Sequence, residues 1–266
     1  MSDLYRIENV SLSLPDLTRK PLLGAAPRLE ILKGISFTIP KGQVLGIVGR
    51  SGSGKSTLGR AMLRLAQPTG GAIWFDGVDI THLPEARLRP LRRRFQMIFQ
   101  DPMSSLNPRQ RIAQIISGPL ALHHVAEPRA RMLETLDLVG LPRGFASRYP
   151  HELSGGQRQR IGIARAIALR PDFILADEIV SGLDVSSQAQ ILNLLEGLVR
   201  DLGLTLAFIS HDLSVIRRLC SRVLVMDKGE IVEAGQTADL FANPKAAYTR
   251  SLLDAIPLPD PDQIWG

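Results

Sequence analysis

The chain has 266 residues, of which 44% are hydrophobic, and a formal net charge of +6. This length and composition fit a globular protein with one large domain, or a domain and a subdomain, and exclude a disordered chain. No apolar run approaches the roughly 20 residues of a membrane span, and we expect no signal peptide. The single cysteine, Cys220, excludes an internal disulfide and a cysteine-rich metal site, and it fits a reducing cytoplasm.

The first 40 residues are predicted to be mostly β-structure. Residues 5–10 and 29–39 carry alternating or continuous apolar side chains, as strands do. The stretch 15–27 between them holds prolines, a glycine and polar side chains, and we expect it to be a loop. Residues 44–48 read Val-Leu-Gly-Ile-Val, and this apolar run is typical of a buried parallel strand.

A complete phosphate-binding loop follows that strand. Residues 49–57 read Gly-Arg-Ser-Gly-Ser-Gly-Lys-Ser-Thr, and residues 58–66 are predicted to be helical, so the loop lies between a strand and a helix, as the motif requires. Its glycines allow amide N–H groups to face an anion. Lys55 is expected to reach the β- and γ-phosphates of a nucleotide, and the Ser56 hydroxyl to coordinate magnesium. The candidate nucleotide-binding residues are Gly49, Arg50, Ser51, Gly52, Ser53, Gly54, Lys55, Ser56 and Thr57.

The middle of the chain changes from strand to helical periodicity. Residues 71–80 predict two short strands around a turn at Asp76-Gly77. The basic run 87–94 has no interleaved aromatic residues, and we interpret it as a solvated face rather than a nucleic-acid site. Apolar residues recur with helical spacing over 112–141, which predicts an inserted helical subdomain at roughly 102–165.

The rest of the chain alternates strands with helices. A helix is predicted at 158–169, where Pro171 follows closely. Strand patterns lie at 95–99, 173–176, 204–209 and 222–226, and Lys228-Gly229 turns a hairpin into 230–234. This alternation predicts an α/β fold in which a parallel sheet has helices on both faces.

Two acids end the apolar strand at 173–176. At the carboxyl edge of a nucleotide-hydrolysing sheet, where ligands gather, the first acid, Asp177, would hold magnesium. The second acid, Glu178, is placed to act as the general base for the attacking water. A strand that ends in a solvated turn is the alternative, but the phosphate loop in the same chain makes the magnesium site the better interpretation.

Residues 153–157, Leu-Ser-Gly-Gly-Gln, open the helix predicted at 158–169. Ser154 can cap this helix, and the two glycines leave its first N–H groups exposed, which makes a second candidate anion site in the chain. A plain capped helix with a glycine turn is the alternative interpretation.

Taken together and in this order, these motifs resemble the nucleotide-binding subunits of ABC transporters. The motifs are the phosphate loop at 49–57, Gln100, residues 153–157, Asp177-Glu178, Ser181-Gly182-Leu183-Asp184 and His211. The resemblance covers roughly residues 4–257. It implies an ABC ATPase domain at 1–257 followed by a C-terminal tail at 258–266. The implied fold is α/β, a RecA-like P-loop NTPase core with an antiparallel β subdomain and an inserted α-helical subdomain. ATP and Mg²⁺ are the implied cofactors.

The resemblance also implies roles for single residues. Lys55, Glu178 and His211 would be catalytic, and Ser56, Gln100 and Asp177 would be near the metal. Gln100 would also bind nucleotide and couple the site to membrane subunits. Asp184 would lie in a loop that communicates across a dimer. The residues that would contact the γ-phosphate of ATP on a partner subunit are Ser154, Gly155, Gly156 and Gln157.

Two segments resemble one branch of this family. Residues 96–109 and 243–257 are similar to those of ATPases that power importers of oligopeptides, dipeptides and nickel. The implied partners are two membrane permease subunits, a solute-binding protein and a second related ATPase with a cysteine-rich C-terminus, which this chain lacks. The implied location is peripheral, on the cytoplasmic face of the inner membrane, with no nucleic acid as a partner. Di- or oligopeptide import is the first expectation, and nickel import is the alternative.

Three departures from the family pattern qualify this expectation. Ile179-Val180 replaces the usual Pro-Thr after the catalytic acid, a feature similar to the nickel-type subunits. No aromatic residue lies in 10–15 to stack on adenine, so an aliphatic side chain, or Tyr5 from outside this stretch, would meet the base. Residues 15–28 are also longer than the minimal pattern. A non-transport ABC ATPase that acts on nucleic acid is the rival from another class, but it would need a long heptad insertion, and only residues 101–152 separate Gln100 from the 153–157 motif.

Overall fold

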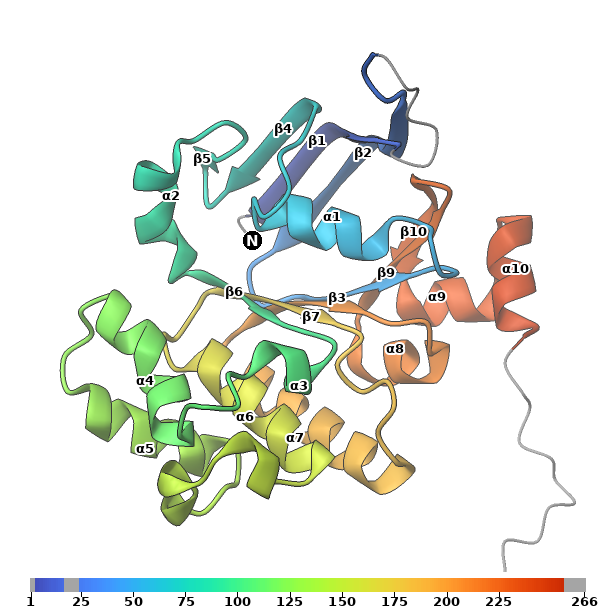
Figure 1. The fold of residues 1–266 in the computed structure, drawn as a ribbon. Coiled ribbons are helices and arrows are strands. Elements are labelled where there is room, and N and C mark those ends of the chain that lie inside the picture. The colour runs from blue at the N-terminus through green and yellow to red at the C-terminus, as the bar shows by residue number, and fades with distance from the viewer. Residues whose placement is uncertain (1–2, 17–23, 256–266) are drawn as a thin grey trace, which may run out of the picture.

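The computed structural model describes residues 3–16 and 24–255 of the chain. The expected loop at 15–27 therefore lies partly outside the described residues, and the expected tail at 258–266 lies wholly outside them. The described residues form two sheets and two sets of helices in stacked layers (Figure 1). None of the helices within 3–16 and 24–255 has the length and apolar character that a bilayer crossing requires.

The central layer is a six-stranded sheet, which confirms the predicted parallel α/β core. Its strand order is β10-β9-β3-β8-β7-β6, and β10 alone among these strands pairs antiparallel with its neighbour. Every residue of β3, β7 and β8 is buried, because these inner strands are covered on both faces. The strands are β3 (Val44–Val48), β6 (Phe95–Ile98), β7 (Phe173–Asp177), β8 (Thr205–Ile209), β9 (Arg222–Asp227) and β10 (Glu230–Gln236).

A second, antiparallel sheet lies over one face of this core. Its order is β2-β1-β4-β5, with β1 (Asp3–Pro15), β2 (Arg28–Pro40), β4 (Gly70–Phe75) and β5 (Val78–Asp79). Helix α1 (Lys55–Met62) lies between the two sheets (Figure 1), where its Leu58 and Met62 join an apolar core. The turn predicted at Asp76-Gly77 joins β4 to β5, with both residues at positive φ.

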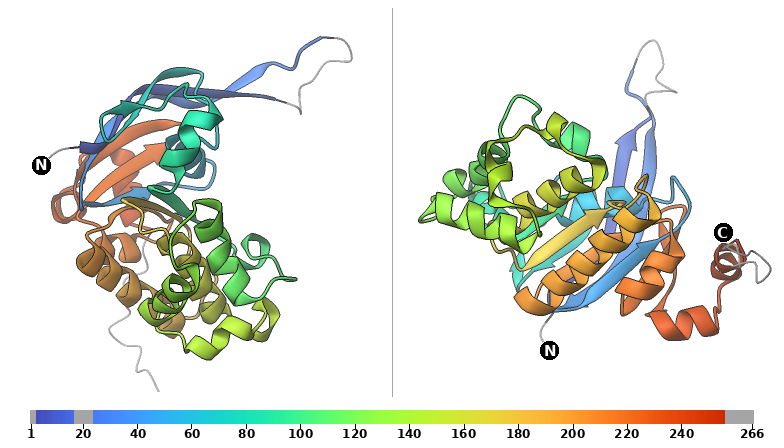
Figure 2. Two further views of the ribbon diagram at one scale, coloured as in Figure 1. Left: turned by 90° about the vertical axis from the view of Figure 1, so that its left-hand side faces the viewer. Right: turned by 90° about the horizontal axis from the view of Figure 1, so that it is seen from below.

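Helices cover the opposite face of the six-stranded sheet. Helices α6 (Gly155–Ile167), α7 (Val185–Leu202) and α8 (Leu213–Leu219) lie on this face, whereas α3 (Pro102–Ser105), α4 (Ile112–Leu122) and α5 (Pro128–Leu138) pack against α6, with 3-10 turns at Arg143–Ser147 and Pro150–Glu152. A second apolar core joins them to the sheet through side chains such as Ile163 and Phe208. Helix α2 (Glu85–Arg92) follows β5, whereas α9 (Thr237–Ala242) and α10 (Ala247–Leu253) lie beyond β10, away from α4 and α5 (Figures 1 and 2). The limits 102–165 for a helical subdomain stay a prediction.

Two predicted helices begin earlier than expected, so those boundaries were wrong. Helix α1 starts at Lys55 rather than at 58, because the phosphate loop itself forms the first turn and Leu58 N donates to Gly54 O at 2.8 Å. Helix α6 starts at Gly155 rather than at 158. Ser154 caps it with a reciprocal pair of bonds to Gln157, which outweighs the low helix propensity of the two glycines.

The packing of β4 on β1 generates a stability prediction at Gly71. Gly71 has φ of +81°, and a Cβ there would lie 2.3 Å from Asn9 O and 2.4 Å from Glu8 O, both in backbone that cannot move aside cheaply. We expect Gly71→Ala to lower the free energy of unfolding by about 2–4 kcal/mol, measured by urea denaturation.

Gly77 is the matched control for this substitution. Its φ of +79° is nearly the same, but a Cβ on this residue would meet nothing within 4 Å. Gly77→Ala should therefore cost only the left-handed backbone penalty, about 1–2 kcal/mol. Equal losses for the two variants would show that the approach of β1 to β4 contributes nothing beyond the backbone angle.

Candidate functional site

The phosphate loop joins β3 to α1 and is shaped by its glycines. Gly49, Gly52 and Gly54 have φ of +154°, +80° and +101°. A Cβ on Gly49 would lie 2.2 Å from Met226 O in β9 and 2.6 Å from Ser53 Oγ, so only glycine lets the loop lie this close to the neighbouring strand. The loop then turns directly into α1, and the first amides of a helix lack partners within the helix and are free to bind an anion.

Lys55 is buried at the base of this loop. Its side chain is only 5% exposed, and Nζ donates to Gly49 O at 2.8 Å and to Arg50 O at 3.0 Å. Burial lowers the pKa of Lys55, while the charges of Glu178 and Asp177 act in the opposite direction. The ammonium group is therefore bonded to carbonyl groups of the phosphate loop and lies near the carboxylates of Glu178 and Asp177.

Asp177 ends β7 at the carboxyl edge of the sheet and meets α1. Ser56 Oγ donates to Asp177 Oδ1 at 3.0 Å. Burial raises the pKa of Asp177, and the charge of Glu178 raises it further, whereas the Ser56 hydrogen bond, Arg60 and Lys55 lower it. Mg²⁺ is usually coordinated by only one or two oxygen atoms of a protein, and phosphate oxygens and water supply the other ligands. The adjacent Ser56 hydroxyl and Asp177 carboxylate provide such a pair of oxygen ligands. The residues present therefore fit a magnesium ion.

Glu178 is met by side chains that follow two other strands. Gln100, just after β6, donates from Nε2 to Glu178 Oε2 at 3.1 Å. His211, just after β8, has Nδ1 3.5 Å from the same oxygen and is 60% exposed. Glu178 itself has φ of +50°, and its backbone N–H donates to Ile209 O at 2.9 Å. The carboxyl ends of three neighbouring strands thus bring together an acid, an amide and an imidazole that lie far apart in the sequence.

A cavity of about 430 Å³ joins the loop to this cluster. Its lining combines loop residues with one residue from each of three other segments, and consists of Ile31, Ser51, Gly52, Gly54, Lys55, Ser56, Thr57, Gln100 and Glu178. Ile31, in β2, is the residue of this set that sequence analysis missed, because nothing in its local pattern marks it. The lining is polar and cationic on the loop side and acidic opposite, as a site for a metal–phosphate group would be.

The motif at 154–157 lies elsewhere. Among the described residues, none of these four lines the cavity; they form the N-terminus of α6, on the helical side of the sheet (Figure 1). Ser154 Oγ accepts from Gln157 N at 3.3 Å, and Gln157 Oε1 accepts from Ser154 N at 3.0 Å. The fold thus keeps this segment apart from its own phosphate loop.

Asp184 lies beside that motif, at the start of α7. Its carboxylate accepts from Ser187 N at 2.9 Å and from Ser187 Oγ at 2.7 Å, and these bonds lower the pKa of Asp184. A Cβ on Gly156 would lie 3.4 Å from Ser187 Oγ, so the two segments are neighbours. Val185, next to Asp184, is 85% exposed. The chain therefore presents its second motif and its Asp184 loop on one surface.

Tyr5 cannot stack on a base, so that alternative was wrong. Its ring is fully buried, 5.0 Å from the Phe75 ring and 4.6 Å from the Phe173 ring, and its hydroxyl donates to Met62 O at 3.3 Å. Two aliphatic side chains are available at the far end of the antiparallel sheet, beside charged residues such as Arg28 and Glu30. Leu14 and Leu29 pair across β1 and β2 and are about half exposed.

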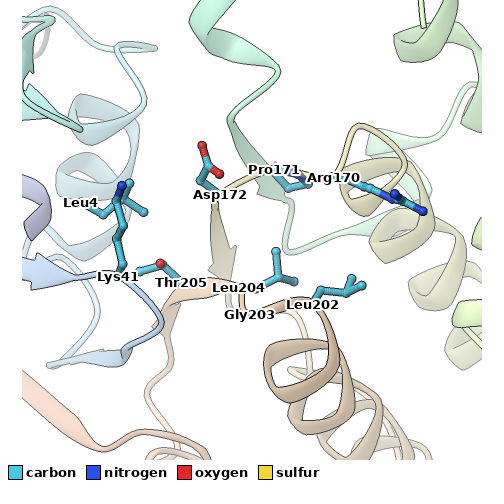
Figure 3. Close-up of a pocket in the computed structure, with 9 residues that line it drawn as sticks. All are labelled: Leu4, Lys41, Arg170, Pro171, Asp172, Leu202, Gly203, Leu204 and Thr205. Atoms are coloured by element: carbon cyan, nitrogen blue, oxygen red, sulfur yellow. The ribbon is translucent and has the colours of Figure 1, made fainter. Parts of the chain in front are cut away.

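A second cavity, of about 190 Å³, lies at the opposite edge of the sheet, where β7 and β8 begin (Figure 3). Its charged side chains are already paired. Lys41 contacts Asp76 at 2.7 Å, Asp172 contacts Arg94 at 2.6 Å, and Arg170 contacts Glu134 at 2.6 Å. This cavity thus lacks the free cationic groups that a phosphate site needs, and the carboxyl edge of the sheet stays the candidate site.

Comparisons with known proteins agree with this geometry. The family profile of ABC transporters matches residues 32–181. A Brucella ovis protein named for peptide import is 54% identical over 237 residues, which are 88% of this chain and 75% of that protein. The Bacillus subtilis oligopeptide transport ATP-binding protein OppF is 51% identical over 240 residues, which are 88% of this chain and 78% of that protein.

Solved structures give the same result for the fold. A dimeric structure of the ATP-binding cassette MJ0796, bound to ADP and Pi, superposes with a TM-score of 0.77 and 30% identity, over 88% of this chain and 98% of that one. The structure of CbiO1 from Clostridium perfringens, part of an ABC transporter complex, superposes with a TM-score of 0.78 and 27% identity, over 91% of this chain and 92% of that one.

Proposed function

The chain belongs to the ABC transporter family, and from this we propose that it is the ATP-hydrolysing subunit of an importer of di- or oligopeptides. The observation that carries the proposal is the shared carboxylate of Glu178, which Gln100 and His211 both approach at the rim of the phosphate-loop cavity. Relatives named for peptide or oligopeptide transport, at 47–54% identity, support the substrate class.

In the proposed reaction the phosphates of ATP lie on the loop amides, and Lys55 leaves the carbonyls of Gly49 and Arg50 to reach the terminal phosphates. Ser56 and Asp177, which lie within hydrogen-bond distance of each other, would hold Mg²⁺, and the ion would supply positive charge to offset that of the phosphates. Glu178 accepts the proton of the water that attacks the γ-phosphate. Gln100 and His211 fix the orientation of that carboxylate, so the rate depends on positioning and charge.

We expect substitutions of the lysine and the base to have different effects. Lys55→Ala should weaken ATP binding roughly ten- to a hundredfold, because a charge-assisted contact with phosphate is lost. Glu178→Gln should keep ATP binding close to wild type and lower kcat roughly a hundred- to ten-thousandfold, because it removes a base and no phosphate ligand. Binding is measured by titration and hydrolysis by phosphate release, with the full chain alone and with its partner subunits.

Glu196→Gln is the matched control. Glu196, on α7, forms an ion pair with Arg218, on α8, and it does not line the cavity. This variant should hydrolyse ATP at the wild-type rate. Wild-type turnover in Glu178→Gln, with its partner subunits present, would remove Glu178 from the role of base.

The separation of the two motifs supports a composite site made by two chains. One chain has one phosphate loop and one motif at 154–157, and its own fold keeps them apart. Two chains arranged head to tail would each offer the motif and the neighbouring Asp184 to the nucleotide of the other. The exposed Val185 would then be covered. We propose a second, related ATPase chain as the physiological partner.

Dimerisation should therefore depend on ATP. The Glu178→Gln chain should be a monomer or weak dimer without nucleotide and should dimerise with ATP, because bound ATP bridges the two surfaces. Ser154→Arg should block this step by placing bulk and charge in the interface. Sedimentation, with and without the partner chain, measures both effects.

Ser147→Arg is the control for that substitution, because Ser147 is an exposed serine in a 3-10 turn near the motif in sequence. It should leave ATP-dependent dimerisation intact. A Glu178→Gln chain that stays monomeric with ATP, even beside its partner chain, would contradict the composite site.

An exposed groove next to Gln100, lined by apolar side chains together with Arg92, Gln96 and Arg165, is the proposed contact with the membrane permeases. It has a volume of about 230 Å³, and its lining includes Leu65 and Phe99, which are 53% and 43% exposed. Phe99 directly precedes Gln100, so a permease segment in this groove would contact the neighbour of the residue that holds Glu178. This arrangement would place the chain peripherally on the cytoplasmic face of the inner membrane.

The substrate is tested by growth of a strain that lacks this chain. We expect it to lose the use of a di- or tripeptide as the sole source of a required amino acid, and to keep nickel-dependent urease or hydrogenase activity. The wild-type chain should restore growth, and Lys55→Ala should not. Normal growth on peptides with lost nickel enzymes would instead favour nickel import, with which Ile179-Val180 agrees.

A further inference from the structure

We propose that Tyr248, in the C-terminal helix α10, is a positioning residue for the phosphate loop and tunes the affinity for ATP. The inference rests on the proposed ATP site but concerns a residue outside it. Tyr248 lies 198 positions from the loop residue that it contacts. It lies in the segment 243–257, whose sequence pattern does not indicate a contact with the phosphate loop.

Tyr248 contacts the loop in two ways. Arg50, the second residue of the loop, donates its backbone N–H to the Tyr248 hydroxyl at 3.0 Å. The Arg50 guanidinium carbon also lies 5.7 Å from the centre of the Tyr248 ring, within the range of a cation–π contact. The first contact fixes the backbone of the loop, and the second fixes its arginine side chain against α10.

The residue that Tyr248 holds also holds the phosphate lysine. Arg50 O accepts from Lys55 Nζ at 3.0 Å, while Arg50 N–H is taken by Tyr248. When Lys55 turns to the phosphates, Arg50 O loses its hydrogen bond from Lys55, but Arg50 N–H keeps its hydrogen bond to the Tyr248 hydroxyl. Tyr248 would thus preserve the shape of the loop before and after ATP binds, which preorganises the site at no further cost in entropy.

The helix that carries Tyr248 is fixed to the sheet. Glu233, in β10, accepts from Lys245 N at 2.8 Å and from Ala246 N at 3.0 Å, which are the two backbone amides before α10. Strand β10 pairs with β9, whose Met226 lies against Gly49. The loop is therefore supported from β9 on one side and from α10 on another, and Figure 1 shows α10 on the same side of the molecule as the start of α1.

The test compares the hydroxyl with the ring, using the full chain, Mg²⁺ and adenylyl imidodiphosphate in titration calorimetry. Tyr248→Phe removes the acceptor and keeps the ring, and it should weaken binding about three- to tenfold, the effect of one neutral hydrogen bond. In hydrolysis it should raise KM by a similar factor and leave kcat unchanged, because the bond is present in both ground and transition states. The thermal midpoint should stay within a few degrees of wild type.

An Arg50→Ala background separates the amide from the side chain. Alanine still donates its backbone N–H, so Tyr248→Phe should weaken binding by the same factor in this background. Tyr149→Phe, which removes a phenolic hydroxyl from the segment before α6, should bind the analogue like wild type.

The outcomes separate this inference from the proposed function. Wild-type binding that persists unchanged in Tyr248→Phe would overturn the positioning role and leave the ATP site intact. An effect that disappears in the Arg50→Ala background would also overturn it, since the contact would then act through the arginine side chain. Failure of the wild-type chain to bind the analogue would instead refute the nucleotide site itself.

Discussion

The buried ammonium of Lys55 is the constraint on which the site depends. A buried charge is tolerated only when it is bonded, and Lys55 finds its acceptors in the carbonyls of the loop that precedes it. The loop can offer them only because Gly49 lies against β9, where a side chain would collide with Met226 O. The strand order that places β3 between β9 and β8 is thus as necessary to the phosphate site as the loop motif itself.

Much of the fold could be predicted because its signals are local. Buried parallel strands are short apolar runs, so β3, β7, β8 and β9 were all found within a residue or two of their ends, as was the turn at Asp76-Gly77. The starts of α1 and α6 were missed because each depends on hydrogen bonds that outweigh propensity. A glycine pair normally disfavours a helix, yet the bonds between Ser154 and Gln157 begin α6 at Gly155.

The site was predictable in its parts but not in its assembly. Lys55, Asp177, Glu178 and His211 each follow a recognisable strand or loop, and the common carboxyl edge of a parallel sheet brings them together. Ile31 and Tyr248 carry no such signal, because each reaches the loop through a contact between segments distant in sequence. Tyr5 was wrongly considered as a residue that stacks on the base. Its aromatic ring is buried in the core between the two sheets.

The arrangement of Gln100 suggests how such a site can respond to its surroundings. Its side-chain amide donates a hydrogen bond to Glu178, the proposed base, and the preceding residue, Phe99, lines an exposed groove. The short segment after β6 therefore borders both the nucleotide cavity and this groove. A protein segment bound in the groove could change the orientation of the Glu178 carboxylate by moving Gln100, while the backbone of Glu178 stays bonded to Ile209 and its carboxylate stays near His211. Hydrolysis would then depend in part on the position of the Gln100 amide, while ATP binding depends on the separately supported loop. The affinity for ATP would thus depend on the phosphate loop, and the rate of hydrolysis on the segment around Gln100.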